Sequence, residues 1–300
     1  MANLSIWLNA SRPRTLPLSL SGIITGSALA IGEGIFTLSI FIPALFTTLA
    51  LQVLSNFAND YGDASKGTDG ENRIGPKRMV QSGFLSIKEI KRAIFFTAGF
   101  SFAMGVLLLI TAFGWSKAKF FALFMVLGLI AIWAAMQYTM GKRAYGYKGL
   151  GDVFVLIFFG FVAVSGSFFL YAKEINGLAL LQSLVIGCMA TGVLHLNNMR
   201  DREQDKSSGK ITLAVMMGPQ YSRNYFYALL LTASASIVLA TLITQDHFMD
   251  FLPLIAIIPL GMILIRVLKV TQNRDYNQFL KPLALSTFFY SIILFISNIA

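Results

Sequence analysis

The sequence predicts an all-α membrane protein, a single domain over residues 1–300 built as a polytopic bundle of nine transmembrane helices. Hydrophobic residues make up 56% of the chain and charged residues only 13%, with a mean hydropathy of +0.68. A soluble domain carries about 25% charged residues, so the composition excludes an ordinary soluble protein. Two further observations support the prediction: the apolar residues fall into runs of membrane-spanning length, and the basic residues are sorted between alternate loops.

A helix needs about 20 apolar residues to cross a bilayer. Nine stretches meet this requirement: 16–31, 37–58, 90–113, 119–139, 152–172, 177–197, 224–244, 250–268 and 280–299. The segment before the first stretch differs from a cleavable signal peptide, because Arg12 and Arg14 follow its first apolar residues and no small-residue cleavage site is evident.

Nine spans place the two termini on opposite sides of the membrane. Of the 24 Lys and Arg residues, 21 fall on the side of the N-terminus, and only Lys117, Lys119 and Lys173 fall on the other. Positive residues concentrate in cytoplasmic loops. The sorting therefore predicts a multi-pass protein of the cell (inner) membrane with a cytoplasmic N-terminus, and it explains the net charge of +10 without a nucleic-acid partner.

Two acidic clusters interrupt the apolar sequence where a predicted span meets a polar loop. The first is Asn56–Asp63, with Asp69 just beyond, and the second is Asn197–Asp205. They introduce two pseudo-repeated Asp-rich loops, 59–89 and 198–223, which the charge count places on the cytoplasmic side. Carboxylates at the edge of a membrane helix are costly, so they mark a candidate functional site on that side.

Helical spacing brings the polar residues of each cluster together. If the second span continues as a helix to Asp63, one stripe contains Asn56, Asn59, Asp60 and Asp63. A second stripe, which drifts only about 40° per step of four residues, contains Asn197, Asp201 and Asp205. Oxygen ligands without His or Cys favour a hard cation such as Mg²⁺. We therefore expect two half-sites that hold Mg²⁺ against one diphosphate.

Basic residues beside both clusters are placed to contact phosphate oxygens: Lys66, Lys77, Arg78, Arg200 and Lys210. The alternative interpretation is that both loops are solvated acidic segments without a function. Two loops that each start from an Asn at a helix end, with matching spacing, argue against that alternative. His195, two residues before the second cluster, is expected to make a polar contact inside the bundle rather than to act in catalysis.

Four stretches of the chain carry a family likeness: 12–17 (Arg-Pro-Arg-Thr-Leu-Pro), 59–69 leading to 75–78, 138–151, and 197–205 continuing through 209–213. Together they resemble the UbiA superfamily of intramembrane aromatic prenyltransferases. Members of that superfamily form a nine-helix bundle with an Asn/Asp-rich motif after the second helix and an Asp-x-x-x-Asp motif after the sixth. The last stretch is most similar to the menaquinone branch.

The resemblance implies roles for individual residues. The expected catalytic carboxylates are Asp60, Asp63, Asp201 and Asp205, and the expected Mg²⁺ ligands are Asn59, Asp63, Asp69, Asp201 and Asp205. The expected diphosphate contacts are Asn56, Lys66, Arg78, Asn197, Asn198, Arg200 and Lys210. The residues expected to orient the acceptor or to stabilise a developing allylic cation are Arg14, Tyr138 and Tyr145.

The menaquinone branch implies transfer of a polyprenyl group from polyprenyl diphosphate to 1,4-dihydroxy-2-naphthoate, with loss of CO₂ and diphosphate, giving demethylmenaquinone. The lipid bilayer is the other expected partner. An alternative is the same transfer to another aromatic acceptor, such as 4-hydroxybenzoate, homogentisate or haem. A membrane transporter is disfavoured, because transporters place polar residues near the bilayer midplane and these spans are nearly free of charge in their interiors.

Overall fold

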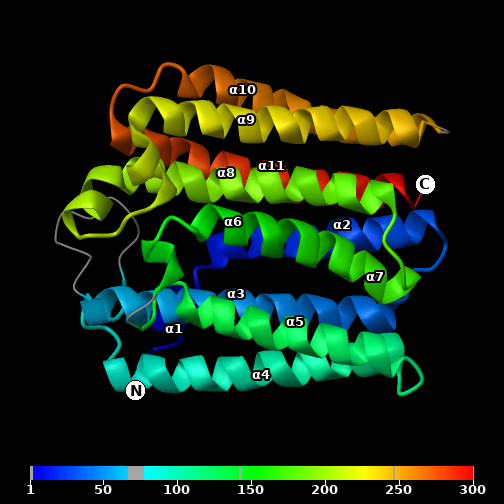
Figure 1. Ribbon diagram of the computed structural model, residues 1–300, viewed down its shortest axis with the longest axis horizontal. Helices are drawn as coiled ribbons and strands as arrows, with labels where there is room; N and C mark the ends of the chain where they lie inside the picture. The colour runs from blue at the N-terminus through cyan, green and yellow to red at the C-terminus, as the bar shows by residue number, and fades with distance from the viewer. Residues whose placement is uncertain (1–2, 67–77, 142–143, 246, 300) are drawn as a thin grey trace.

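The computed structural model is an all-α bundle whose long helices run back and forth along one axis (Figure 1). It describes residues 3–66, 78–141, 144–245 and 247–299. Within these ranges there are nine helical segments long and apolar enough to cross a membrane, and no strand beyond one isolated bridge between Lys148 and Ile211. The prediction of a nine-helix membrane bundle is confirmed.

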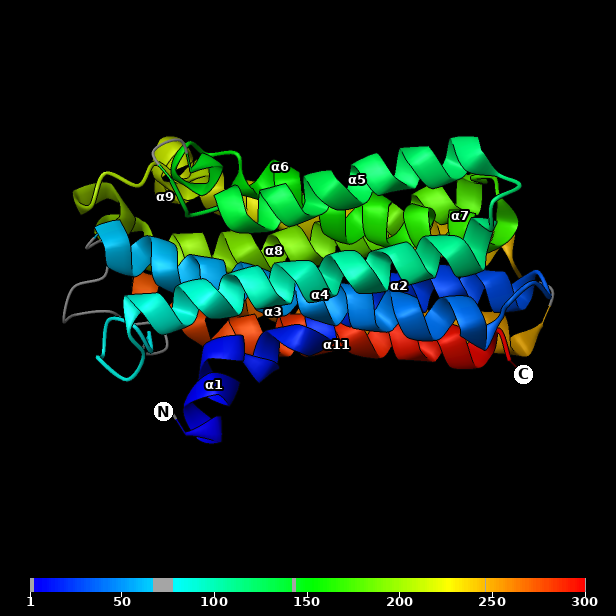
Figure 2. The same ribbon diagram turned by 90° about the horizontal axis from the view of Figure 1, so that it is seen from below.

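The first half of the chain supplies four spans. A short helix and a 3₁₀ turn lead into the first of them, and the elements are α1 (Leu4–Ser11), η1 (Pro13–Thr15), α2 (Leu16–Gly32), α3 (Leu38–Lys66), α4 (Ile87–Phe113) and α5 (Ala118–Gln137). Figure 2 shows α1 leaving the bundle at an angle, at the same end as the acidic clusters. Leu4 and Leu8 of α1 are exposed, as expected for an apolar helix face at a membrane surface.

The second half supplies five spans, several of them composite. The fifth combines α6 (Gly151–Val155), the π-helix η3 (Leu156–Ser165) and α7 (Gly166–Ala172), preceded by the 3₁₀ turn η2 (Tyr145–Tyr147). The remaining elements are α8 (Gly177–Ser207), α9 (Leu213–Ile243), η4 (Phe248–Ala256) with α10 (Ile257–Val267), and η5 (Asn273–Tyr276) with α11 (Asn277–Ser297).

Two helices extend well past their predicted ends, and these extensions carry the acidic clusters. The second span was predicted to end at residue 58, whereas α3 continues to Lys66, and α8 continues past residue 197 to Ser207. The condition for the first polar stripe, a helix that reaches Asp63, is therefore met. Both extensions lie at the same end of the bundle (Figure 1).

The seventh span also differs from its prediction, because α9 begins at Leu213 rather than near residue 224. Thr212 caps its first turn by accepting a hydrogen bond from the backbone N–H of Val215. The helix is then broken at Gly218, whose φ of 73° lies in the left-handed region, immediately before Pro219. Proline lacks the backbone N–H that a continuous helix requires, so a kink separates the first turn of α9 from the membrane span.

Small residues let η3 and its neighbours approach each other closely. A Cβ atom added at Gly160 of η3 would lie 2.6 Å from the carbonyl oxygen of Ser183 and 2.9 Å from the Cα of Gly187, both in α8. On the other side of η3, a Cβ at Gly22 of α2 would lie 2.4 Å from that of Ala163. Close backbone contact at small residues is a main source of helix association in membranes.

Replacing Gly160 with Ala should lower the thermal unfolding temperature of the purified protein in detergent. The added methyl group has no space, and overpacking of this kind destabilises a protein by about 1–3 kcal/mol. The matched control is Gly99→Ala in α4, where an added Cβ meets nothing within 4 Å, and its unfolding temperature should be unchanged or slightly higher. Equal shifts for both variants would contradict the packing argument.

Candidate active site

The two acidic clusters lie at the head of one large cavity inside the bundle. Its volume is about 980 Å³, and its wall is formed by residues of the first six spans and of α11. Asp63 and Asp201 line the polar end. The rest of the wall is mostly apolar and includes Phe124, Phe169 and Leu180. The cavity therefore has a charged end, here called its head, and a long apolar remainder, here called its body.

The first half-site is built on the extended end of α3. Asp63 forms an ion pair with Arg78 and accepts a hydrogen bond from the hydroxyl of Tyr147 at 2.9 Å. One turn earlier, the Oδ1 atom of Asn59 accepts a hydrogen bond from the Thr139 hydroxyl at 3.0 Å. Lys66 Nζ donates to the carbonyl oxygen of Thr139 at 2.7 Å. The predicted residues Asn59, Asp63, Lys66 and Arg78 are thus brought together.

The second half-site is built on the extended end of α8. Arg200 donates to Asp201 through Nε at 2.7 Å and through Nη2 at 2.6 Å. The same guanidinium also donates to the side-chain oxygens of Asn197 and Asn277, each at 2.8 Å. One helical turn after Asp201, Asp205 forms an ion pair with Lys210 at 3.1 Å. An arginine with this many partners holds its carboxylate and amides in one fixed arrangement.

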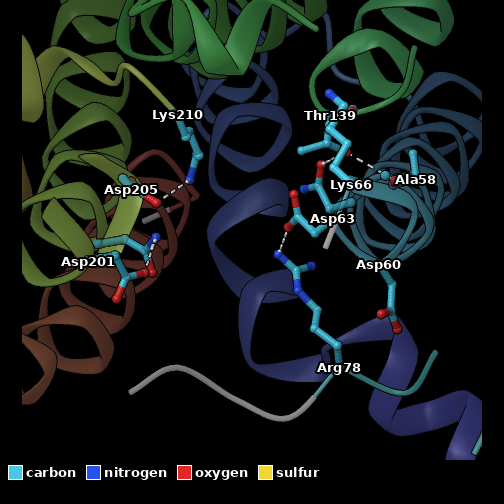
Figure 3. A network of polar contacts seen from close by, with 12 residues as sticks. Ala58, Asp60, Asp63, Lys66, Arg78, Thr139, Asp201, Asp205 and Lys210 are labelled. Atoms are coloured by element: carbon cyan, nitrogen blue, oxygen red, sulfur yellow. Dashed lines mark hydrogen bonds and ion pairs between the residues drawn. The ribbon is translucent and has the colours of Figure 1, made fainter. Parts of the chain in front are cut away.

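Figure 3 shows the half-sites facing each other, with Asp201, Asp205 and Lys210 on one side and Asp63, Lys66 and Arg78 on the other. Tyr147 connects them. Its ring has Lys66 Nζ 3.9 Å and Lys210 Nζ 6.0 Å from its centroid, and its carbonyl oxygen accepts the N–H of Ile211 at 3.2 Å. Tyr147 therefore contacts residues of both half-sites, and sequence reasoning overlooked it.

Asp60 does not join this arrangement. It does not line the cavity, and Figure 3 shows its side chain pointing away from Asp63. Its Oδ2 atom accepts the backbone N–H of Met79 at 3.0 Å instead. Successive helix residues are separated by about 100°, so Asn59 and Asp60 lie on opposite edges of the predicted stripe. Only Asn59 lies on the edge next to Thr139.

Two predicted diphosphate contacts line the cavity but use their amide groups elsewhere. Asn56 Nδ2 donates to the carbonyl oxygen of Ser11 at 2.8 Å, which ties α3 to the end of α1. Asn198 Nδ2 donates to Asp152 at 3.4 Å. Arg14 also lines the cavity. The predicted ligand Asp69 and the predicted phosphate contact Lys77 lie outside the described residues.

Tyr138 and Tyr145 both line the cavity just below its polar end. Their rings meet edge to face at 5.3 Å, and Tyr145 stacks on Phe154 at 4.0 Å. Burial, reinforced by the nearby Asp152 carboxylate, raises the pKa of Tyr138 well above its ordinary value. Burial likewise raises the pKa of Tyr145. Both phenols therefore stay protonated at neutral pH, and neither serves as a base.

Several further polar residues of the site were not predicted from the sequence. Asn277 and Lys281 of α11 line the cavity, although no acidic motif marks that helix. His195 does make the expected polar contact, and its partner is Asp152, at 2.7 Å. The spacing between Gly151-Asp152 and His195 gives no signal of their proximity, because they belong to different spans.

The residues at the polar end fit a hard divalent cation. They offer carboxylate and amide oxygens, the ligands that Mg²⁺ prefers, and Mg²⁺ commonly takes only one or two carboxylates, with water and phosphate completing its shell. The Oδ2 atom of Asp205 is buried and has no hydrogen-bond partner among the described residues. No group of three or more His, Cys, Asp or Glu side chains in those same ranges forms a ready-made metal cage. The described residues therefore fit a cation that takes one or two carboxylates and completes its shell with water and phosphate.

The model of the UbiA prenyltransferase family matches residues 19–293, which is most of the chain. The chain belongs to the UbiA prenyltransferase family. It is 43% identical over 261 residues to a 1,4-dihydroxy-2-naphthoate octaprenyltransferase of Haemophilus influenzae, covering 84% of each chain. It is 42% identical to the Escherichia coli protein of the same name, covering 83% of this chain and 80% of that one.

Solved structures of the family share the fold. A UbiA homolog from Archaeoglobus fulgidus bound to DMAPP and Mg²⁺ superposes with a TM-score of 0.64 at 16% identity, covering 97% of this chain and 98% of that chain. The apo structure of a UbiA homolog from Aeropyrum pernix superposes with a TM-score of 0.66 at 15% identity, covering 99% and 98%. The fold prediction and the family resemblance are both confirmed.

Proposed function

We propose that this protein transfers a polyprenyl group from polyprenyl diphosphate to 1,4-dihydroxy-2-naphthoate in a Mg²⁺-dependent reaction. The observation that carries the proposal is the pair of half-sites facing each other across the head of an apolar cavity. The names of the two bacterial relatives described above support the choice of acceptor. The first product is the quinol form of demethylmenaquinone, together with CO₂ and diphosphate.

The diphosphate would bind between the half-sites. The basic residues there already neutralise carboxylates: Arg78 pairs with Asp63, Arg200 with Asp201 and Lys210 with Asp205. Lys66 and these three residues would donate to phosphate oxygens. Asn59, Asp63, Asp201 and Asp205 would hold Mg²⁺, and Asp69 remains a predicted ligand. When bound, Mg²⁺ would offset the negative charge that builds up on the departing diphosphate.

The apolar body of the cavity would hold the polyprenyl tail. As the bond between the allylic carbon and the diphosphate oxygen lengthens, that carbon gains cationic character. The rings of Tyr138 and Tyr145 line the wall near the polar end, and an aromatic face stabilises a nearby cation. The surrounding apolar side chains keep water from capturing it. Arg14 remains a predicted contact of the acceptor.

The carbon–carbon bond can then form without an oxidant or an external base. The ring carbon that bears the carboxylate attacks the allylic carbon, and the electron pair of the breaking C–O bond leaves with the diphosphate. The bond from this ring carbon to the carboxylate then breaks. Its electrons restore the aromatic ring, and the carboxylate leaves as CO₂.

Mass spectrometry of products provides the direct test of this function. Purified protein incubated with Mg²⁺, a polyprenyl diphosphate and 1,4-dihydroxy-2-naphthoate should yield the prenylated, decarboxylated naphthalenediol and one CO₂ per turnover. The same incubation with 4-hydroxybenzoate or homogentisate should give little or no product. Prenylation of either of these acceptors in preference to the naphthoate would overturn the assignment.

Replacing Asp63 or Asp201 with Asn should lower the turnover number by at least about 100-fold, because even the outer partners of metal ligands contribute roughly 10- to 100-fold. Each Asn variant retains the size and a hydrogen-bonding oxygen but loses the charge. The matched control is Asp275→Asn, an aspartate outside the cavity that pairs with Arg274 at 4.0 Å. Near-normal prenyl transfer by both site variants would refute the Mg²⁺–carboxylate proposal.

We also propose that the site opens toward the cytoplasm, which rests on the sorting of basic residues. In a background with Cys188, the only cysteine, changed to Ala, a membrane-impermeant maleimide should label Ser116→Cys in intact cells. It should label Ser82→Cys, at the acidic-cluster end, only after the membrane is opened. The reverse pattern of labelling would invert the proposed orientation.

A further inference from the structure

Two buried titratable residues lie behind the wall of the cavity, and the reaction proposed above does not use them. They are Asp152 of α6, with 1% of its surface exposed, and His195 of α8, with none. The Nδ1 atom of His195 lies 2.7 Å from Asp152 Oδ2, and its Nε2 atom lies 3.1 Å from the carbonyl oxygen of Ser222. A carbonyl oxygen only accepts, so Nε2 carries a proton and the ring is fixed at both ends.

Asn198 connects this pair to the cavity. Its Nδ2 atom donates to the second carboxylate oxygen of Asp152 at 3.4 Å, and the residue lines the cavity. The described residues supply no hydrogen bond to its side-chain oxygen. Because the NH₂ group is held by Asp152, the atom that Asn198 presents to a ligand is a carbonyl oxygen. Such an oxygen can accept a hydrogen bond from a ligand but cannot donate one.

Asn198 lies at the boundary between the polar head and the apolar body of the cavity. The cavity-facing stripe of α8 runs from Leu194 through Asn198 to Asp201 and Asp205. With a rise of about 1.5 Å per residue, Asn198 lies roughly 4.5 Å along the helix axis from Asp201, toward the apolar end of the cavity. Tyr138 and Gly151, the residue before Asp152, line the same cavity. At this depth the allylic carbon of a diphosphate held between the half-sites would meet the acceptor ring.

We propose that Asp152 and His195 are positioning residues that hold the side-chain oxygen of Asn198 toward the cavity, where it accepts a hydrogen bond from a ring hydroxyl of the aromatic acceptor. The inference rests on the proposed prenyl transfer and adds a contact that selects phenolic acceptors. It also replaces the sequence-based prediction that Asn198 binds diphosphate. A diphosphate offers the amide carbonyl only acceptor oxygens, whereas a dihydroxynaphthoate offers two O–H donors.

The proposal requires the hydrogen bonds of Asp152 rather than its charge. Asp152→Asn keeps an oxygen for Asn198 Nδ2 and can supply an N–H group to His195 Nδ1, so both hydrogen-bond partners are retained while the carboxylate charge is removed. Asp152→Leu has the same number and branching of side-chain heavy atoms but removes both interactions and leaves the Asn198 amide free to rotate. The two variants therefore separate positioning through hydrogen bonds from a role in charge or proton transfer.

The test is steady-state kinetics of purified variants, with the prenyl diphosphate and the dihydroxynaphthoate varied separately. Asp152→Leu and Asn198→Ala should each lower kcat/KM for the acceptor by roughly tenfold, about the value of one hydrogen bond to a ligand. The KM for the prenyl diphosphate and the Mg²⁺ requirement should stay within about twofold of the parent. Asp152→Asn should behave like the parent. In the Asn198→Ala background, Asp152→Leu should add little, because the two changes act through one group.

The matched control is Tyr290→Phe in α11, which removes a buried hydrogen bond to Gln182 of α8, away from the cavity. Its acceptor kinetics should not change. Mg²⁺-dependent binding of the prenyl diphosphate reports whether Asp152→Leu is folded, and if it is not, Asn198→Ala and Asp152→Asn still decide the proposal.

Three results would overturn the inference. An equal loss in Asp152→Asn and Asp152→Leu would assign a charge or proton role. A rise in the KM for the diphosphate or in the Mg²⁺ requirement would place Asn198 in the diphosphate site. Unchanged acceptor kinetics in Asn198→Ala would remove its contact with the acceptor. Failure of the proposed function is a separate outcome, because the unmodified protein would then not prenylate the dihydroxynaphthoate at all.

Discussion

Charge compensation inside an apolar bundle is the constraint on which this structure depends. Carboxylates this close to a membrane interior are tolerated only beside cations, and the two half-sites meet that condition with Arg78, Arg200 and Lys210. The proposed diphosphate with Mg²⁺ would add both anionic and cationic partners, so it would exchange with these internal pairs without leaving a buried charge alone. The same balance accounts for basic residues directly beside each acidic cluster.

The scaffold that holds these charges depends on close packing at small residues. Gly160, Gly187 and Gly22 bring η3, α8 and α2 into backbone contact, where few alternative packings exist. The acidic ends of α3 and α8 are continuous with membrane helices rather than mounted on loops, so the positions of Asp63 and Asp201 follow from helix packing. Tyr147 then joins the two ends directly.

The features that follow from composition and helical periodicity could be predicted from the sequence. These are the nine spans, the two polar stripes, and the placement of Asn59 with Asp63 and of Asp201 with Asp205 on one helix face each. The predicted ends of α3 and α8 fell short because polar residues such as Asn59 and Asp201 continue a helix once neighbouring side chains hydrogen-bond to them. Asp60 does not line the cavity, because a stripe of four residues is wide and only tertiary contacts decide which edge faces it. No local sequence pattern predicts contacts between residues that are far apart in the chain. Such contacts bring Tyr147, Asn277 and the Asp152–His195 pair into place.

The number of residues in the π-helix η3 is constrained, because its two sides make different contacts. One side of this segment meets α8 through Gly160, and the other contributes Phe158, Phe159 and Val162 to the cavity wall. Deleting one residue would rotate everything that follows by a large part of a turn, moving cavity residues into the helix contact and small residues into the cavity. An insertion or deletion in an exposed turn displaces only that turn. Side chains on the cavity-facing side of η3 can therefore change more readily than the number of residues there.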